Sequence, residues 1–165
     1  MKKLDKVQET VETYYDTINK IVVDIITPYS KSLDKYVKFI RDCLADGQES
    51  PTDAELEDWC LNLSTYIYFA GAMSEQLGIK DDISKAVYKE VYHSKRSNVD
   101  KGTIADKDSI AELESQEEFI INICYSRAYK MMKSKVENAQ ELLTSCKKAL
   151  SNRMQQAELT RIGGN

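Results

Sequence analysis

The sequence predicts an all-α protein built from long helices with few connections. Glycine and proline are scarce, at six and two in 165 residues, and charged residues make up 30% of the chain. Apolar residues recur at spacings of three and four along most of the sequence, which is the period of one helix face. We divide the chain into an N-terminal helical segment (1–46), a helical region with a basic motif (47–102) and a long C-terminal helix (103–162).

The N-terminal segment is predicted to form either one kinked helix or two helices. Its first apolar stripe comprises Leu4, Val7, Val11, Tyr14, Ile18, Val22 and Ile25. Pro28 interrupts this stripe, because proline lacks a backbone N–H and its ring clashes with the preceding turn. The pattern resumes at Tyr29 and is predicted to end at Asp46-Gly47, which leaves both the kink and the break open.

The middle region begins with a predicted loop over Gly47–Pro51. The sequence Thr52-Asp53-Ala54-Glu55 then matches a capping box, in which the hydroxyl and the carboxylate each bind a free backbone N–H. We expect the helix that follows to end at Gly78, since glycine is favoured just after a helix. A shorter basic helix over residues 81–94 and a loop over 95–102 complete the region.

The C-terminal region contains no proline or glycine between Thr103 and Gly163, so it predicts one coiled-coil-like helix of up to about 55 residues. We do not expect a helix of this length to bury its apolar stripe within 165 residues. The sequence therefore predicts a helical homo-oligomer, and the residues assigned to its oligomerisation seam are Tyr125, Met132, Val136, Leu143, Leu150 and Met154.

No catalytic, metal or cofactor site is recognisable, and we expect the protein not to be an enzyme. The chain has a single histidine, no glycine-rich phosphate loop and no CxxC pair. Its cysteines (Cys43, Cys60, Cys124 and Cys146) are best interpreted as buried thiols, and Asp106-Lys107-Asp108 as an acidic helix start. Neither a signal peptide nor a membrane span is predicted, which favours a cytoplasmic protein.

Charge is spread unevenly along the chain, whose net charge is −4. Residues 1–79 carry a net charge of −6, whereas residues 121–165 carry +5. This asymmetry indicates an anionic partner or head-to-tail assembly, or else a long helix whose lysines keep it soluble.

One basic segment also contains aromatic residues, and its members are Lys85, Tyr88, Lys89, Tyr92, His93, Lys95 and Arg96. Cations that follow phosphates and rings that stack on bases are typical of proteins that bind single-stranded nucleic acid. The alternative is that Val87, Val91 and one tyrosine belong to the core while the lysines form ordinary surface.

The order of these features resembles the UvsY-type recombination mediators of tailed bacteriophages. The matching stretches are Tyr66–Ala70, the basic motif Tyr88–Arg96, Ala105-Asp106-Lys107-Asp108, and Cys124–Met154 with Ser151–Met154 at its basic end. Lys89 lies in register with one basic residue of the family motif, and Val87 occupies the place of the other. The resemblance covers roughly residues 52–157.

The resemblance implies a ring-shaped helical homo-oligomer that binds single-stranded DNA in the host cytoplasm. Such a protein would load a RecA-like recombinase onto strands coated by single-strand-binding protein. The alternative function is that of a non-enzymatic helical adaptor, or a phage inhibitor, that acts through protein–protein contacts alone. The sequence does not fix the subunit number.

Overall fold

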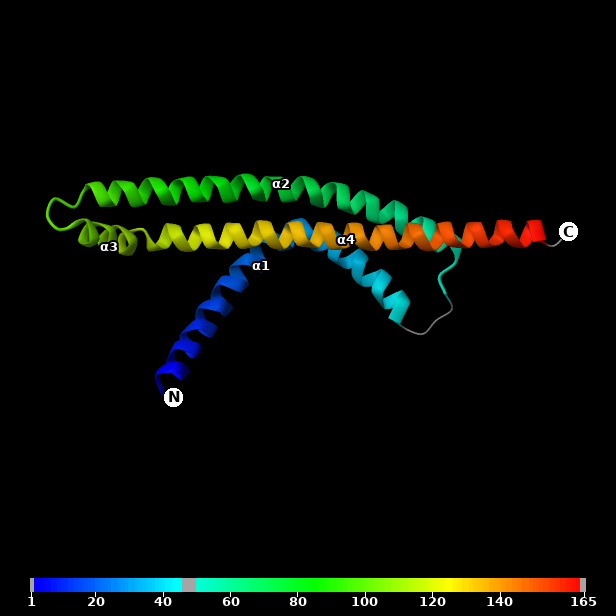
Figure 1. The fold of residues 1–165 in the computed structure, drawn as a ribbon, viewed down its shortest axis with the longest axis horizontal. Helices are drawn as coiled ribbons and strands as arrows, with labels where there is room; N and C mark the ends of the chain where they lie inside the picture. Colours follow the sequence, from blue (N-terminus) through cyan, green and yellow to red (C-terminus); the bar gives the residue numbers. More distant parts are fainter. Residues whose placement is uncertain (1, 46–49, 164–165) are drawn as a thin grey trace. The chain divides into compact units, whose positions relative to one another are not determined.

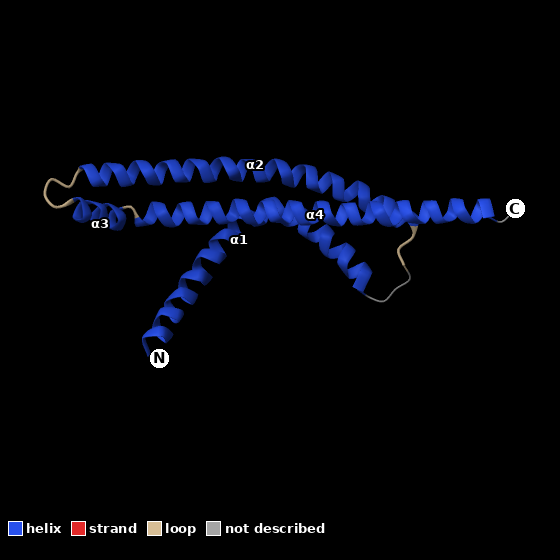
Figure 2. Cartoon of the chain, viewed as in Figure 1, coloured by secondary structure: helices blue, strands red, loops and turns tan. Residues whose placement is uncertain are grey.

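A computed structural model describes the backbone of residues 2–45 and 50–163, and the side chains of residues 6–45 and 50–162. Within these residues every regular element is a helix, which confirms the all-α fold class (Figure 2). The four helices are α1 (Lys2–Ala45), α2 (Asp53–Ser97), α3 (Ile104–Glu114) and α4 (Gln116–Gly163) (Figure 1).

Contacts divide the chain into two compact units, and α1, α2 and α4 each contribute to both. Unit 1 contains Met1–Pro28 and Ser74–Met131, and unit 2 contains Tyr29–Met73 and Met132–Asn165. The three regions read from the sequence, 1–46, 47–102 and 103–162, are divisions along the chain and stay a prediction.

In both units α2 and α4 run antiparallel. In unit 2, Arg153 Nη1 donates a hydrogen bond to Asp53 Oδ1 at 3.2 Å. In unit 1, Asn122 Nδ2 donates to Ser84 Oγ at 3.1 Å. α2 and α4 therefore lie side by side within each unit. The largest fully buried apolar side chains are Ile40 of α1, Leu63 and Leu77 of α2 and Met132 of α4.

This pairing corrects our expectation that the C-terminal stripe could not be buried within one chain. Met132 and Val136 are buried, and Tyr125, Leu143 and Leu150 are half-buried, whereas Met154 is exposed. The reason is that other helices of the same chain pack on α4: α2 runs beside it, and in unit 2 Lys135 Nζ also donates a hydrogen bond to Asp34 Oδ1 of α1 at 2.6 Å. A role of this seam in oligomerisation stays a prediction.

Pro28 does not break the first helix, because α1 continues through it to Ala45. Ile26 and Ser30, on either side of the proline, are buried. Burial of the flanking residues is a tertiary contribution that offsets the loss of one backbone hydrogen bond. The predicted end at Asp46-Gly47 and most of the predicted loop over 47–51 lie outside the described residues.

Gly78 does not end a helix either, which corrects the prediction of two helices between residues 52 and 94. It lies inside α2, where a Cβ atom would come within 3.2 Å of the Cε2 atom of Tyr129 on α4. The glycine therefore serves a close approach of two helices. α2 also runs further than predicted, to Ser97, so Lys95 and Arg96 lie in its last turn and not in a loop.

Ser115 interrupts the C-terminal region, which we predicted to be one helix. Its hydroxyl and its N–H both donate hydrogen bonds to the carbonyl of Ala111, at 2.7 Å and 3.0 Å, and its side chain is fully buried. The backbone of Ser115, at φ −110° and ψ 16°, leaves the helical region, so α3 ends at Glu114 and α4 begins at Gln116.

The predicted capping box at the start of α2 is confirmed. The backbone N–H of Thr52 donates to Glu55 Oε2 at 2.7 Å, and the N–H of Glu55 donates to Thr52 Oγ1 at 3.2 Å. The acidic helix start predicted at Asp106 is confirmed as well, since Thr103 and Asp106 form the same reciprocal pair at the start of α3.

Candidate functional site

The seven basic and aromatic residues singled out in the sequence all lie at the C-terminal end of α2, in unit 1. We call them the tyrosine–basic cluster. Lys85, Lys89 and His93 are exposed, whereas Tyr88, Tyr92, Lys95 and Arg96 are half-buried. α2 carries all seven, including Lys95 and Arg96, which the sequence placed in a loop.

Carboxylates of α3 engage three members of the cluster. Arg96 Nε donates to Asp108 Oδ1, and the Tyr92 hydroxyl donates to the same oxygen at 3.3 Å. Lys95 Nζ lies 3.4 Å from Glu114 Oε2. The hydrogen bond and the charge of Asp108 raise the pKa of Arg96, so α3 presents its acidic side chains to the basic end of α2.

The sequence pattern does not reveal these carboxylates. It assigns Asp108 only to an acidic helix start and gives no sign that Glu114 is a partner for the cluster. The one available signal was the short connection between α2 and α3, which brings residues twelve positions apart, such as Arg96 and Asp108, into contact.

The aromatic rings of the cluster pack partly on one another. The ring centroid of Tyr88 lies 5.3 Å from that of Phe119 on α4 and 6.3 Å from that of Tyr92, while Tyr92 makes an edge-to-face contact with His93. Tyr88 therefore packs on a ring that is itself 45% exposed, and neither residue is among the buried core side chains. Val87 is 44% exposed.

The cations that stay available to a ligand lie on one strip of α2. Lys85 and Lys89 form no ion pair with any residue that the structure describes, and neither does His93. These three residues follow one another at intervals of four, so they share one side of the helix. The available positive charge, on Lys85 and Lys89, therefore lies before the last turn of α2. The charges of Lys95 and Arg96, in the last turn, are balanced by carboxylates of α3.

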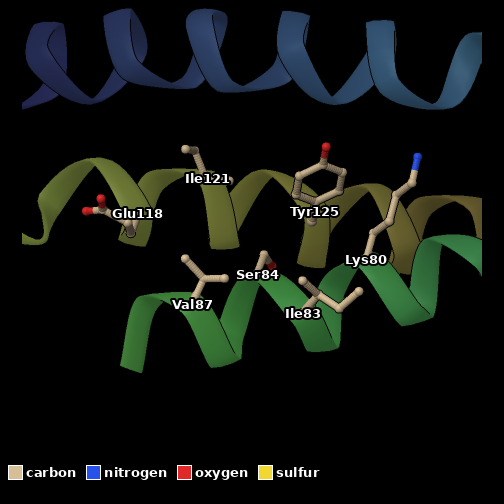
Figure 3. Close-up of a pocket in the computed structure, with 7 residues that line it drawn as sticks. All are labelled: Lys80, Ile83, Ser84, Val87, Glu118, Ile121 and Tyr125. Carbon is tan, nitrogen blue, oxygen red and sulfur yellow. The ribbon is translucent and has the colours of Figure 1, made fainter. Parts of the chain in front are cut away.

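A second surface of unit 1 is an apolar groove of about 280 Å³ between α2 and α4 (Figure 3). Ile83 and Val87 of α2 and Ile121 and Tyr125 of α4 supply its apolar walls, and Lys80 and Glu118 also line it. Ile83 and Ile121 are both more than half exposed. Tyr125, which the sequence assigned to an oligomerisation seam, thus borders an open groove.

Three of the four cysteines lack the activation that a nucleophile requires. Burial raises the pKa of the thiols of Cys60, Cys124 and Cys146, so the reactive thiolate is disfavoured at each. Cys124 and Cys146 are buried as predicted, whereas Cys43 and Cys60 are half-buried. Among the described residues, no group of three or more metal-binding side chains comes together.

Comparison with protein-family models, with curated proteins and with solved structures found no significant match. None of the helices in the described part of the chain is both long and apolar enough to span a lipid bilayer.

Proposed function

We propose that this protein binds single-stranded DNA and acts as a recombination mediator, which helps a RecA-like recombinase to load onto strands coated by single-strand-binding protein. The observation that carries the proposal is the exposed strip of Lys85, Lys89 and His93 beside Tyr88 and Tyr92 on α2. The motif resemblance to UvsY-type mediators supports the mediator role, and the DNA-binding role stands on the strip itself.

The chemistry of the strip fits a weak, sequence-independent contact with nucleic acid. Lys85 and Lys89 would neutralise phosphates, and a partly exposed tyrosine would stack on a base. The carboxylates of Asp108 and Glu114 reduce the positive field next to the strip, so the affinity of one copy is expected to be low. Several copies on one strand would raise the overall affinity through multivalency.

Fluorescence anisotropy with a labelled oligo(dT) tests the proposal. We expect binding at ~50 mM salt that weakens steeply by ~200 mM, because each neutralised phosphate releases counterions. The double variant K85A/K89A should weaken binding. The matched variant K35A/K38A, which removes two exposed lysines from α1, should not. Absence of binding at the lower salt concentration, or equal loss in both variants, would contradict the proposal.

The apolar groove favours a second candidate function, that of a helical adaptor. Grooves lined by Ile, Val and Tyr side chains accept the apolar face of an amphipathic helix from a partner protein. A photo-crosslinking amino acid at Val87 should then form one discrete protein adduct, while the same group at exposed Asp82 should form none. Discrete crosslinking at Val87 together with no DNA affinity would favour the adaptor over the mediator.

A further inference from the structure

The start of α1 has an apolar face that no residue described by the structure covers. Every described side chain from Lys6 to Thr17 is exposed. Val7, Val11 and Tyr14 are 62%, 58% and 56% exposed, although side chains of this size are among those that proteins usually bury.

This face is continuous with a packed one. Val7, Val11, Tyr14 and Ile18 follow at spacings of four, three and four, which places them on one side of the helix. Further along the same helix Ile18 is half-buried and Val22 is buried. The stripe that packs within unit 1 therefore extends beyond the packed part toward the N-terminus.

The charges of the segment lie on its other side. Glu9, Glu12 and Asp16 fall opposite the apolar stripe on the helix, with Lys6 at the edge of that charged side. The residues that border the stripe, Gln8, Thr10, Tyr15 and Thr17, are uncharged. Two identical faces of this kind can meet without bringing like charges together.

We infer that residues 6–18 of α1 form a self-association surface, on which the same segment of a second copy of this chain packs. The segment belongs to the 44-residue helix α1, so the drive for association is removal of the exposed Val7, Val11 and Tyr14 side chains from water. A second copy supplies an identical uncharged face, and in a twofold dimer the same patch of each copy meets the other. The surface is distinct from the seam that the sequence analysis assigned to α4, and it does not depend on DNA binding.

Light scattering on the full chain tests the inference over about a hundredfold range of protein concentration, because association follows mass action. Wild-type protein should be a dimer or a larger assembly at the upper end of this range. Val11→Glu, which places a charge in the stripe, should shift the mass to that of the monomer. Thr13→Glu adds the same charge on the charged side of the helix and should leave the mass unchanged.

Circular dichroism shows whether the variants keep their helix content, and Tyr14→Glu provides a second disruption of the same stripe. A wild-type monomer throughout the concentration range would overturn the inference. So would an assembly that Val11→Glu and Tyr14→Glu leave intact, or one that only a change in the α4 seam, such as Met154→Glu, dissociates. Oligo(dT) binding by a monomeric, folded Val11→Glu variant would show separately whether the proposed DNA contact stands.

Discussion

Removal of the Asp108 carboxylate should strengthen single-stranded DNA binding. Asp108 holds Arg96 through an ion pair and accepts a hydrogen bond from Tyr92, so it occupies one cation and one aromatic hydroxyl of the tyrosine–basic cluster. Asp108→Asn keeps the shape of the side chain and removes its charge. The capping of α3 should be unaffected, because Asp106 and not Asp108 forms the capping box with Thr103.

The size of the effect follows from the exposure of the pair. The side chains of Arg96 and Asp108 are 42% and 38% exposed, so water screens their attraction and a phosphate can compete for the guanidinium. We expect the dissociation constant for oligo(dT) to fall about two- to fivefold, which corresponds to the loss of one such surface pair. The slope of log affinity against log salt should become steeper by about 0.7, because one more cation meets a phosphate.

Fluorescence anisotropy at several salt concentrations measures both quantities. Asp16→Asn is the matched control, since it makes the same change in net charge at an exposed position of α1. An equal gain in affinity for both variants would mean that only net charge matters. No gain for Asp108→Asn would show that Arg96 does not meet the DNA.

Three further predictions concern stability. Leu63→Ala should lower the free energy of unfolding in urea by about 2–5 kcal/mol, because Leu63 is fully buried, whereas Leu61→Ala, at an exposed position, should change it by less than about 0.5 kcal/mol. Burial and the Asp58 carboxylate raise the pKa of Tyr36 from its ordinary value of 10.0 to about 12. Because the folded pKa lies above the unfolded one, Tyr36 contributes stability that is present below pH 10.0 and is lost as the pH rises to about 12. The melting temperature should therefore fall more steeply over this pH range in the wild type than in Tyr36→Phe. Thr103→Ala should lower the stability of α3 by about 1 kcal/mol, because it removes the N-terminal cap of that helix. Faster hydrogen exchange of the first α3 amides would report this loss.

Features encoded within a few residues could be predicted from the sequence. The box formed by Thr52 and Glu55 needs only two side chains three positions apart, and so does the acidic start at Asp106. The helical character of the chain followed in the same way from the spacing of its apolar residues and the scarcity of glycine and proline.

Features that depend on a distant contact could not be predicted. Gly78 has the local signature of a helix end, but it lies inside α2, where a Cβ atom would come within 3.2 Å of Tyr129, which lies far along the sequence. Ser115 has no local signature of a helix end, yet the backbone leaves the helical region there. The burial of much of the α4 stripe within one chain could not be predicted for the same reason, since it is a property of the fold.

The sequence indicates where the residues of the tyrosine–basic cluster lie along the chain, but it does not show which of their charges are paired. Lys85, Lys89 and His93 are exposed on one strip because helix periodicity alone places them there. The pairing of Arg96 with Asp108 depends on how the connection between α2 and α3 turns, and a pattern of residue types does not specify that turn.

The antiparallel pairing of α2 with the helices that follow it also sets the order in which the chain can fold. Paired residues are 12 positions apart at Arg96 and Asp108, 38 apart at Ser84 and Asn122, and 100 apart at Asp53 and Arg153. Contacts near α3 close the shortest loops and therefore carry the smallest entropic cost, and each one shortens the loop that the next must close. The rate of folding should accordingly be most sensitive to substitutions near α3, and substitutions near Asp53 should chiefly accelerate unfolding.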